Sequence, residues 1–217
     1  GRGVARGSPR PRRIEGEGRV ISLRRQYGDV IRRRVERGEA GRLLDLGLRW
    51  VGAAASRPLG RPLLGPTLGT LLVTYRCNLR CLVCDLPQRA LRRRAEGERE
   101  LGTRAFEAVL RDMKAIGTLG VGVSGGEPML RDDLVHLLAY GRRLGLHRHL
   151  NTDGFRVPEH AARLVATGVE SVNVSLDGST AAVHDRARGR AGAFEDACSA
   201  LRALARRRRS AASMRLT

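Results

Sequence analysis

The chain has 217 residues, 41% hydrophobic and 29% charged, which predicts one folded domain with a sizeable core and excludes two large independent domains. Its formal net charge of +19 comes from 41 basic and 22 acidic residues, and Lys114 is the only lysine, an arginine bias that we attribute to genome composition. Because only 3% of the residues are aromatic, base-stacking surfaces are scarce, and a basic nucleic-acid-binding protein is left as a less favoured alternative.

The first third of the chain is predicted to be peripheral to the core. Residues 1–19 combine glycine, proline and arginine with almost no apolar side chains, so we expect a disordered basic tail. Residues 20–66 are predicted to be a helical extension and linker, since helical spacing runs from 20 to about 55 and residues 57–66 hold three prolines and two glycines. A basic amphipathic helix can lie on a membrane surface, but packing against the outside or mouth of the core is favoured.

Residues 67–217 alternate short apolar runs with helical patterns, which is typical of consecutive β-α units and a parallel sheet. The predicted strands are residues 70–75, 120–124, 147–151, 171–176 and 213–217. Between them, Phe106, Val109, Leu110 and Met113 fall on one face of a helix, and two later segments repeat that spacing. The predicted fold class is therefore α/β, a partial parallel barrel that stops after about four β-α units.

Three cysteines follow the first predicted strand in a C-x3-C-x2-C spacing, at Cys77, Cys81 and Cys84. Thiolates are soft ligands that suit zinc or iron-sulfur clusters, and three of them are one short of the usual four, which leaves an iron free to bind another molecule. Cys198 is interpreted as a small buried hydrophobe, because it lies on the apolar face of a predicted helix. A zinc-binding interaction module remains the alternative.

The location predicted for the chain is the cytoplasm. The sequence has no apolar run of about 18 residues and no apolar core of a secretion signal near its first residue. The cytosol keeps thiols reduced, so the cysteines are better interpreted as metal ligands or free thiols than as disulfides.

Polar motifs end the next three predicted strands, and the carboxyl ends of parallel strands meet at one edge of a sheet. They are Ser124-Gly125-Gly126-Glu127-Pro128, Asn151-Thr152-Asp153-Gly154 and Ser175-Leu176-Asp177-Gly178. The paired glycines let the backbone approach a ligand, and the glutamate can accept from an ammonium group. Each motif alone is also a plausible turn, but together with the cysteines they predict a composite site.

The triplet, the Gly-Gly-Glu-Pro and the Ser-Leu-Asp-Gly resemble those of the radical S-adenosylmethionine (radical SAM) superfamily, over residues 68–217. The resemblance implies that Cys77, Cys81 and Cys84 hold a 4Fe–4S cluster whose fourth iron binds the methionine part of S-adenosylmethionine (SAM). It implies that Gly125, Gly126 and Glu127 contact the methionine amino group of SAM. Thr152 and Asp153 would lie near the ribose, and Ser175 near the ribose or the carboxylate. Arg188 would bind the carboxylate. Arg188 is placed by the run from His184 to Gly189, which is similar to a His-Asp-x-x-Arg segment in many members.

The same resemblance implies an enzyme that cleaves SAM reductively to a 5'-deoxyadenosyl radical and modifies a peptide or a cofactor precursor. It implies an electron donor such as a flavodoxin or ferredoxin and a peptide or small-molecule substrate. The spacing is most similar to members that carry a SPASM or twitch-type auxiliary domain at the C-terminus. One departure is Val83, where the family often has an aromatic residue near the adenine.

Overall fold

The structure is a computed structural model that describes residues 40–60, 62–208 and 215–216. The chain divides into two compact units, Gly1–Gly52 and Ala53–Thr217. Helix α2 (Ala40–Leu59) continues two residues past Arg57, where the linker was predicted to begin. The predicted disordered tail lies outside the described residues, and the predicted boundaries after residues 19 and 66 stay predictions.

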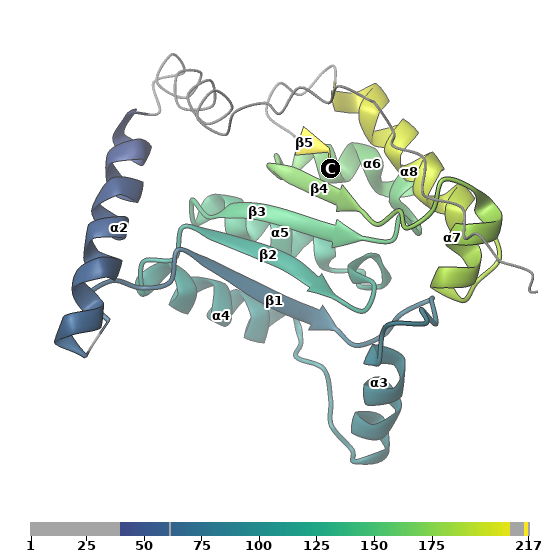
Figure 1. The fold of residues 1–217 in the computed structure, drawn as a ribbon, viewed down its shortest axis with the longest axis horizontal. Coiled ribbons are helices and arrows are strands. Elements are labelled where there is room, and N and C mark those ends of the chain that lie inside the picture. Colours follow the sequence, from purple (N-terminus) through teal and green to yellow (C-terminus); the bar gives the residue numbers. More distant parts are fainter. Residues whose placement is uncertain (1–39, 61, 209–214, 217) are drawn as a thin grey trace, which may run out of the picture. The chain divides into compact units, whose positions relative to one another are not determined.

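A parallel sheet forms the centre of the second unit, with the strands in the order β1-β2-β3-β4-β5 (Figure 1). The strands are β1 (Leu68–Thr74), β2 (Gly120–Gly125), β3 (His147–Thr152), β4 (Ser171–Val174) and β5 (Arg215–Leu216). Sequential strands are neighbours, as β-α units require. The predicted α/β partial barrel is confirmed.

One strand ends earlier than the sequence predicted. β4 stops at Val174, so Ser175 and Leu176 lie in the following loop. The Asp177 N–H is bonded to Nδ1 of His184 at 3.1 Å instead of to a neighbouring strand. The Asp177 donor is therefore used by a side chain of α7 in this loop.

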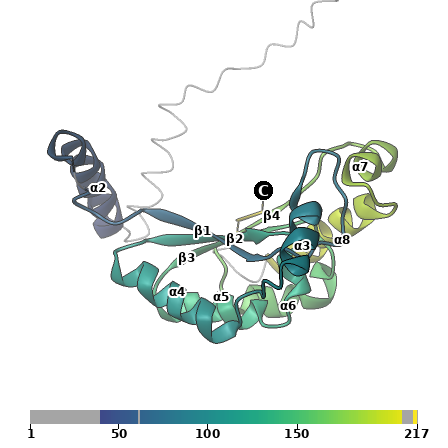
Figure 2. The ribbon, with the colours of Figure 1, turned by 90° about the horizontal axis from the view of Figure 1, so that it is seen from below.

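Helices pack along one face of this sheet (Figure 2). They are α4 (Thr103–Ala115), α5 (Leu134–Arg143), α6 (Val157–Ala166) and α8 (Ala193–Arg208), with α3 (Leu86–Ala95), α7 (Ala181–Arg188) and the short η1 (Pro128–Leu130) near the carboxyl ends of the strands. Alternate strand residues such as Val73, Leu150 and Val172 point into this interface and are buried. On the opposite face Leu68 and Leu72 are exposed. None of the described helices is both long and apolar enough to span a membrane.

A buried arginine on β3 forms hydrogen bonds to α5 and to the segment between α6 and β4. Arg148 is 2% exposed and pairs with Glu170 through Nη2 at 2.6 Å and Nε at 3.1 Å. The same guanidinium donates to the carbonyls of Leu138, Thr167 and Gly168 at 2.8–3.2 Å. Each of these acceptors would lose its bond to the guanidinium if the side chain were removed, although Glu170 keeps the backbone N–H of Arg148 and the Thr167 carbonyl keeps Arg142 Nη1.

We therefore expect Arg148→Met to lower the free energy of unfolding by about 3 kcal/mol, because it removes the charged partner of Glu170 and the guanidinium donor of three carbonyls. Urea denaturation followed by circular dichroism measures the change. Arg143→Met, an exposed arginine on α5, is the control and should change stability by less than about 0.5 kcal/mol. Equal effects of the two substitutions would contradict this role of Arg148.

Candidate functional site

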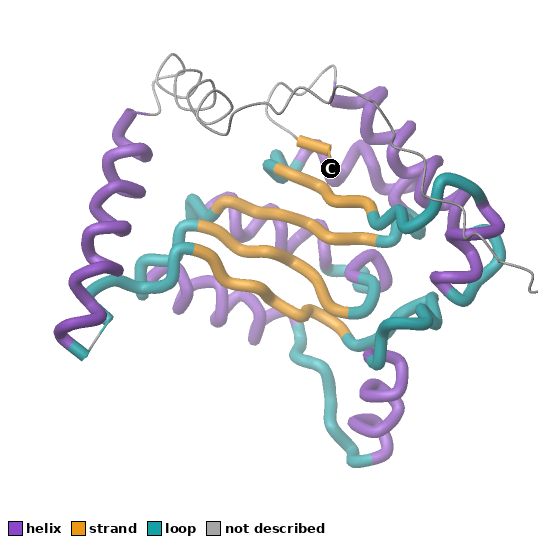
Figure 3. The backbone as a smooth tube through the Cα atoms, in the orientation of Figure 1, coloured by secondary structure: helices purple, strands orange, loops and turns teal. Residues whose placement is uncertain are grey.

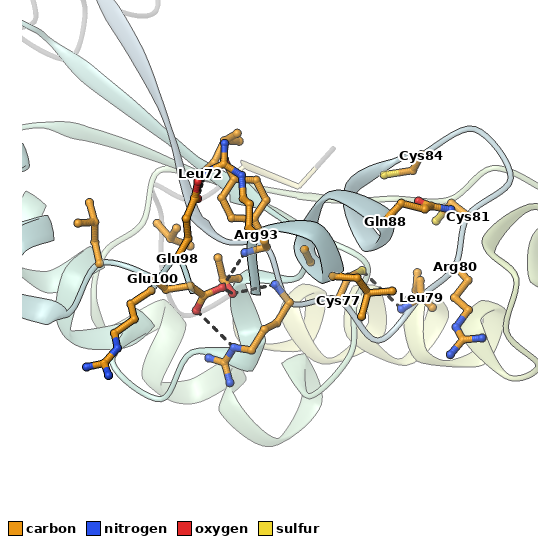
Figure 4. A pocket seen from close by; sticks show the side chains of 18 of the residues that line it. Leu72, Cys77, Leu79, Arg80, Cys81, Cys84, Gln88, Arg93, Glu98 and Glu100 are labelled. Carbon is orange, nitrogen blue, oxygen red and sulfur yellow. Dashed lines mark hydrogen bonds and ion pairs between the residues drawn. The ribbon is translucent and has the colours of Figure 1, made fainter. Parts of the chain in front are cut away.

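The three cysteines of the triplet lie on one loop between β1 and α3, which we call the cysteine loop (residues 75–85). Cys77, Cys81 and Cys84 are free thiols that line one pocket of about 1090 Å³, together with residues of α3 and of the segment that follows it (Figure 4). Cys198 is on α8 and is not among the residues that line this pocket. The structure thus separates the triplet from Cys198, which is half-buried and not fully buried as predicted.

The donor set of the cysteine loop is three thiols on one short loop, and thiolates suit iron-sulfur clusters or zinc. Both polar side-chain atoms of Asn78 are buried without a hydrogen-bond partner, so the loop has unused donors and acceptors beside the first cysteine.

Burial and nearby negative charge act together on the first thiol. Burial raises the pKa of Cys77 to about 11, although the N–H of Leu79, which donates to its Sγ at 3.4 Å, acts in the opposite direction. The charges of Asp153 and Glu127 raise that pKa further. Their influence indicates that these two carboxylates, from the ends of other strands, lie near the first cysteine.

Glu100, which the sequence analysis did not single out, fixes the point where the cysteine loop leaves β1. Its Oε1 accepts from Thr74 Oγ1 at 2.5 Å and from the Tyr75 N–H at 2.8 Å, and Oε2 lies 3.4 Å from Arg76 Nε. Burial would raise the pKa of Glu100, but these hydrogen bonds and the Arg76 charge outweigh it and lower the pKa. Glu100 stands in a polar run with no periodicity, so the sequence offered no signal for this role.

The two glycines at the end of β2, Gly125 within the strand and Gly126 after it, let the strand end contact the start of the cysteine loop. A Cβ on Gly125 would lie 2.4 Å from Thr74 O, and one on Gly126 would lie 2.1 Å from Arg76 O. The N–H groups of Gly126 and Glu127 donate to these same two carbonyls at 2.8 Å. The motif's amides are therefore committed to the protein, and its carbonyls are the groups suited to accept from a ligand ammonium.

Glu127 joins the end of β2 to the end of β3. Its carboxylate is 1% exposed and accepts from Met129 N at 2.8 Å, Thr152 Oγ1 at 2.8 Å and Asp153 N at 2.7 Å. Burial, followed by the negative charge of Asp153, raises the pKa of Glu127 to about 8. The side chain that was predicted to meet the methionine amino group is used here inside the protein.

The polar residues at the ends of β3 and β4 belong to the same hydrogen-bond network as Glu127. Thr152 is buried, and its carbonyl accepts from the Ser175 N–H at 2.9 Å. Asp153 Oδ1 accepts from Phe155 N at 2.8 Å, while Oδ2 is buried without a donor. A carboxylate oxygen that lacks a donor suits a hydroxyl of a bound molecule.

Arg188, at the end of α7, lies between the β4 loop and the cysteine loop. Its Nε is 2.8 Å from Asp177 Oδ2, its Nη2 donates to Oδ1 at 3.0 Å, and its Nη1 lies 3.8 Å from Cys81 Sγ. His184, buried on the same helix, accepts from the Asp177 N–H, and Asp185 accepts from backbone amides at the start of α8. The His-Asp-x-x-Arg run therefore shapes this corner, a role for His184 and Asp185 that the sequence analysis did not assign.

The loops that follow β1, β2, β3 and β4 lie at the carboxyl edge of the sheet (Figure 3), and the predicted site residues belong to these loops, to the last residues of the strands and to the end of α7. Hydrogen bonds connect the cysteine loop to the Gly-Gly-Glu motif, that motif to Thr152 and Asp153, and Thr152 to Ser175. Arg188, at the end of α7, contacts Cys81 and so connects α7 to the cysteine loop. Such an edge can present a metal centre beside acceptors for an ammonium and for hydroxyl groups.

Comparison with known proteins agrees with this arrangement. The family model described as "Radical SAM superfamily" matches residues 71–215. The chain belongs to the radical SAM superfamily. Among curated relatives of this radical SAM chain, Mycofactocin maturase MftC of Mycobacterium tuberculosis is 37% identical over 133 residues, covering 59% of this chain and 32% of the relative. Fe-coproporphyrin III synthase of Methanosarcina barkeri is 38% identical over 123 residues, covering 56% and 30%.

Solved structures share the fold of the radical SAM chain. Streptococcus suis SuiB bound to S-adenosylmethionine matches with a TM-score of 0.55 and 16% identity, over 88% of this chain and 45% of that one. SuiB bound to its precursor peptide SuiA matches with a TM-score of 0.54 and 18% identity, over 79% and 42%. The chain spans about a third of the length of the curated relatives that it matches.

The cofactors of the radical SAM superfamily, to which this chain belongs, are a 4Fe–4S cluster and SAM. The thiols of the cysteine loop, the unpaired Asn78 amide and the unpaired Asp153 oxygen fit these groups. Val83, which departs from the family pattern, is 96% exposed, so the loop presents a small aliphatic side chain to solvent at this position.

Proposed function

We propose that this chain is the cofactor-binding core of a radical SAM enzyme that modifies a peptide or a cofactor precursor. The observation that carries the proposal is the connected edge of the sheet, where the cysteine loop is hydrogen-bonded to the Gly-Gly-Glu motif on one side and to the end of α7 on the other. Relatives named as a Mycofactocin maturase and an Fe-coproporphyrin III synthase, and a fold neighbour bound to a precursor peptide, support the substrate class.

Each side chain of the edge has a proposed task. The thiolates of Cys77, Cys81 and Cys84 hold the cluster, and the carbonyls of Gly125 and Gly126 accept from the methionine ammonium. Glu127 acts mainly by fixing the ends of β2 and β3, because its carboxylate already accepts three hydrogen bonds.

The remaining predicted residues are proposed to bind the other parts of SAM. Asp153 Oδ2 accepts from a ribose hydroxyl, Thr152 lies beside it and donates to Glu127, and Ser175 contributes to the ribose or carboxylate position. Arg188 offers Nη1 to the carboxylate, because its other nitrogens are paired with Asp177. When both cofactors are bound, the reduced cluster supplies the electron that cleaves SAM to methionine and a 5'-deoxyadenosyl radical.

Further parts of the proposal concern the whole protein. We propose a flavodoxin or ferredoxin as electron donor and an auxiliary domain of the SPASM or twitch type, since the relatives are about three times longer than the matched region. The cytoplasmic location stays a prediction.

Anaerobic reconstitution of the chain with iron and sulfide tests the cofactor assignment. We expect about four irons and four sulfides per chain, a reduced-state signal in electron paramagnetic resonance (EPR), and a change in that signal when SAM is added. Binding of zinc with no sulfide uptake would instead support the zinc-binding alternative. A reconstituted cluster whose signal ignores SAM would contradict the proposed SAM site.

A further inference from the structure

The carboxyl end of α7 supports the cysteine loop through backbone hydrogen bonds, and we call this contact the seat. The N–H of Arg80 donates to the Arg188 carbonyl at 3.1 Å, and the N–H of Leu82 donates to the Ala187 carbonyl at 3.0 Å. These are the last carbonyls of the helix, which have no partner within it. The middle of the cysteine loop, between the first and third cysteines, is thus held by the helix end.

Close approach at this seat depends on Gly189. Its φ is +66°, and a Cβ there would lie 2.2 Å from the Arg80 carbonyl oxygen. Any other residue would be strained and would also push against the loop backbone. The glycine after α7 is therefore matched to the position of the cysteine loop as well as to the end of the helix.

The arginine of the seat is aimed at a thiol. Asp177 holds the Arg188 guanidinium through Nε and Nη2, which leaves Nη1 directed at Cys81 Sγ, 3.8 Å away. The Arg188 side chain is only 16% exposed, so solvent screens its charge little. Among the described residues, Cys81 is the only thiol that accepts a hydrogen bond from an arginine.

We infer that Arg188 is a positioning residue for the cluster, separate from any contact with SAM: its guanidinium donates to the Cys81 thiolate and favours the reduced state of the metal centre. The inference rests on the proposed function. Reduction adds negative charge to a cluster, and a hydrogen bond or positive charge near a ligand sulfur stabilises the more negative state. Asp177 orients the donor, and the end of α7 fixes the sulfur that receives it.

The test measures the midpoint potential of the reconstituted cluster, without SAM, by EPR-monitored redox titration. Arg188→Met should shift the potential to a more negative value or lower the cluster content. Arg186→Met, which removes the same charge from an exposed position on α7, should leave both at the wild-type values. Arg188→Lys keeps a charge and should give a potential between those of the wild type and Arg188→Met.

Substitutions at glycine test the seat independently. Gly189→Ala should lower the iron retained per chain at least twofold, whereas Gly192→Ala should retain the wild-type amount. Gly192 also has a positive φ, +83°, but a Cβ there meets nothing within 4 Å, so it matches the backbone strain without the clash. Circular dichroism checks that both variants are folded.

Each result decides one point. The inference would be overturned if Arg188→Met and Arg186→Met had the same midpoint potential and the same cluster content. If Arg188→Met does not fold, Arg188→Lys replaces it, and a wild-type midpoint potential in that variant would overturn the inference. Equal iron retention in Gly189→Ala and Gly192→Ala would show that the seat does not help to hold the cluster. Failure of the wild-type chain to take up any cluster would refute the proposed function itself, which is a different outcome.

Discussion

Replacing any one of Cys77, Cys81 and Cys84 with alanine is expected to abolish the stable 4Fe–4S cluster. The three thiols lie on one loop and line one pocket, and each is proposed to bind its own iron, so the loss of one cannot be compensated by the other two. Within the described residues no further group of cysteine, histidine or carboxylate side chains converges there as a substitute. Iron and sulfide per chain after desalting, together with the visible absorption of the cluster, measure the loss.

Cys198→Ala is the matched control, because Cys198 lies on α8 and lines no part of that pocket. It should retain the wild-type iron and sulfide content and cost only a small packing energy. Loss of the cluster in Cys198→Ala, with the triplet intact, would show that the ligand assignment is wrong. Retention of a full cluster by all three triplet variants would refute it as well.

The stability of the cluster-free chain is expected to fall as the pH rises from about 5 to above 8, because of Glu127. Its pKa in the folded protein is raised from 4.5 to about 8, first by burial and then by the charge of Asp153. Folding therefore favours the protonated carboxyl. The contribution is complete below pH 4.5 and is lost as the pH rises through 8, with a total of about 3 to 5 kcal/mol.

Glu127→Gln should flatten this dependence, since an amide does not ionise in that range. The amide oxygen can still accept from Met129 N and Thr152 Oγ1, but the amide nitrogen faces the N–H of Asp153, which costs about 1 to 3 kcal/mol at acidic pH. Urea denaturation between pH 5 and 8.5 measures both effects. The exposed Glu159→Gln on α6 is the control and should keep the wild-type slope.

Other titrating groups act outside this window. Hydrogen bonds and nearby arginines outweigh burial and lower the pKa of Glu100 and of Asp133, so their stabilisation is present above pH 4.5 and is lost only at lower pH. The pKa of Cys77 is raised from 9.0 to about 11, which moves its titration above the window. A wild-type stability that is flat from pH 5 to 8.5 would contradict the assignment to Glu127.

The sequence by itself determined the sheet and the set of residues at its edge. Alternation of apolar strands with amphipathic helices predicts a parallel sheet, and the carboxyl ends of parallel strands meet. For this reason Cys77, Gly126 and Thr152, which are far apart along the chain, could be placed at one edge before any coordinates were known. The cysteine spacing also indicated the metal class, because ligand chemistry is a property of the side chains alone.

Only the tertiary structure decided what those side chains do. Glu127 was expected to meet a ligand, but its position between β2 and β3 gives its carboxylate three donors from the protein, and Arg188 is paired with Asp177 and aimed at Cys81. Glu100 entered the site without a sequence signal, and His184, which belongs to the His-Asp-x-x-Arg run, accepts from Asp177, a role that the sequence did not indicate. Periodicity fixes which face of an element is buried, whereas hydrogen-bond partners depend on side-chain positions within a few tenths of an ångström, and these are set only when all the elements pack together.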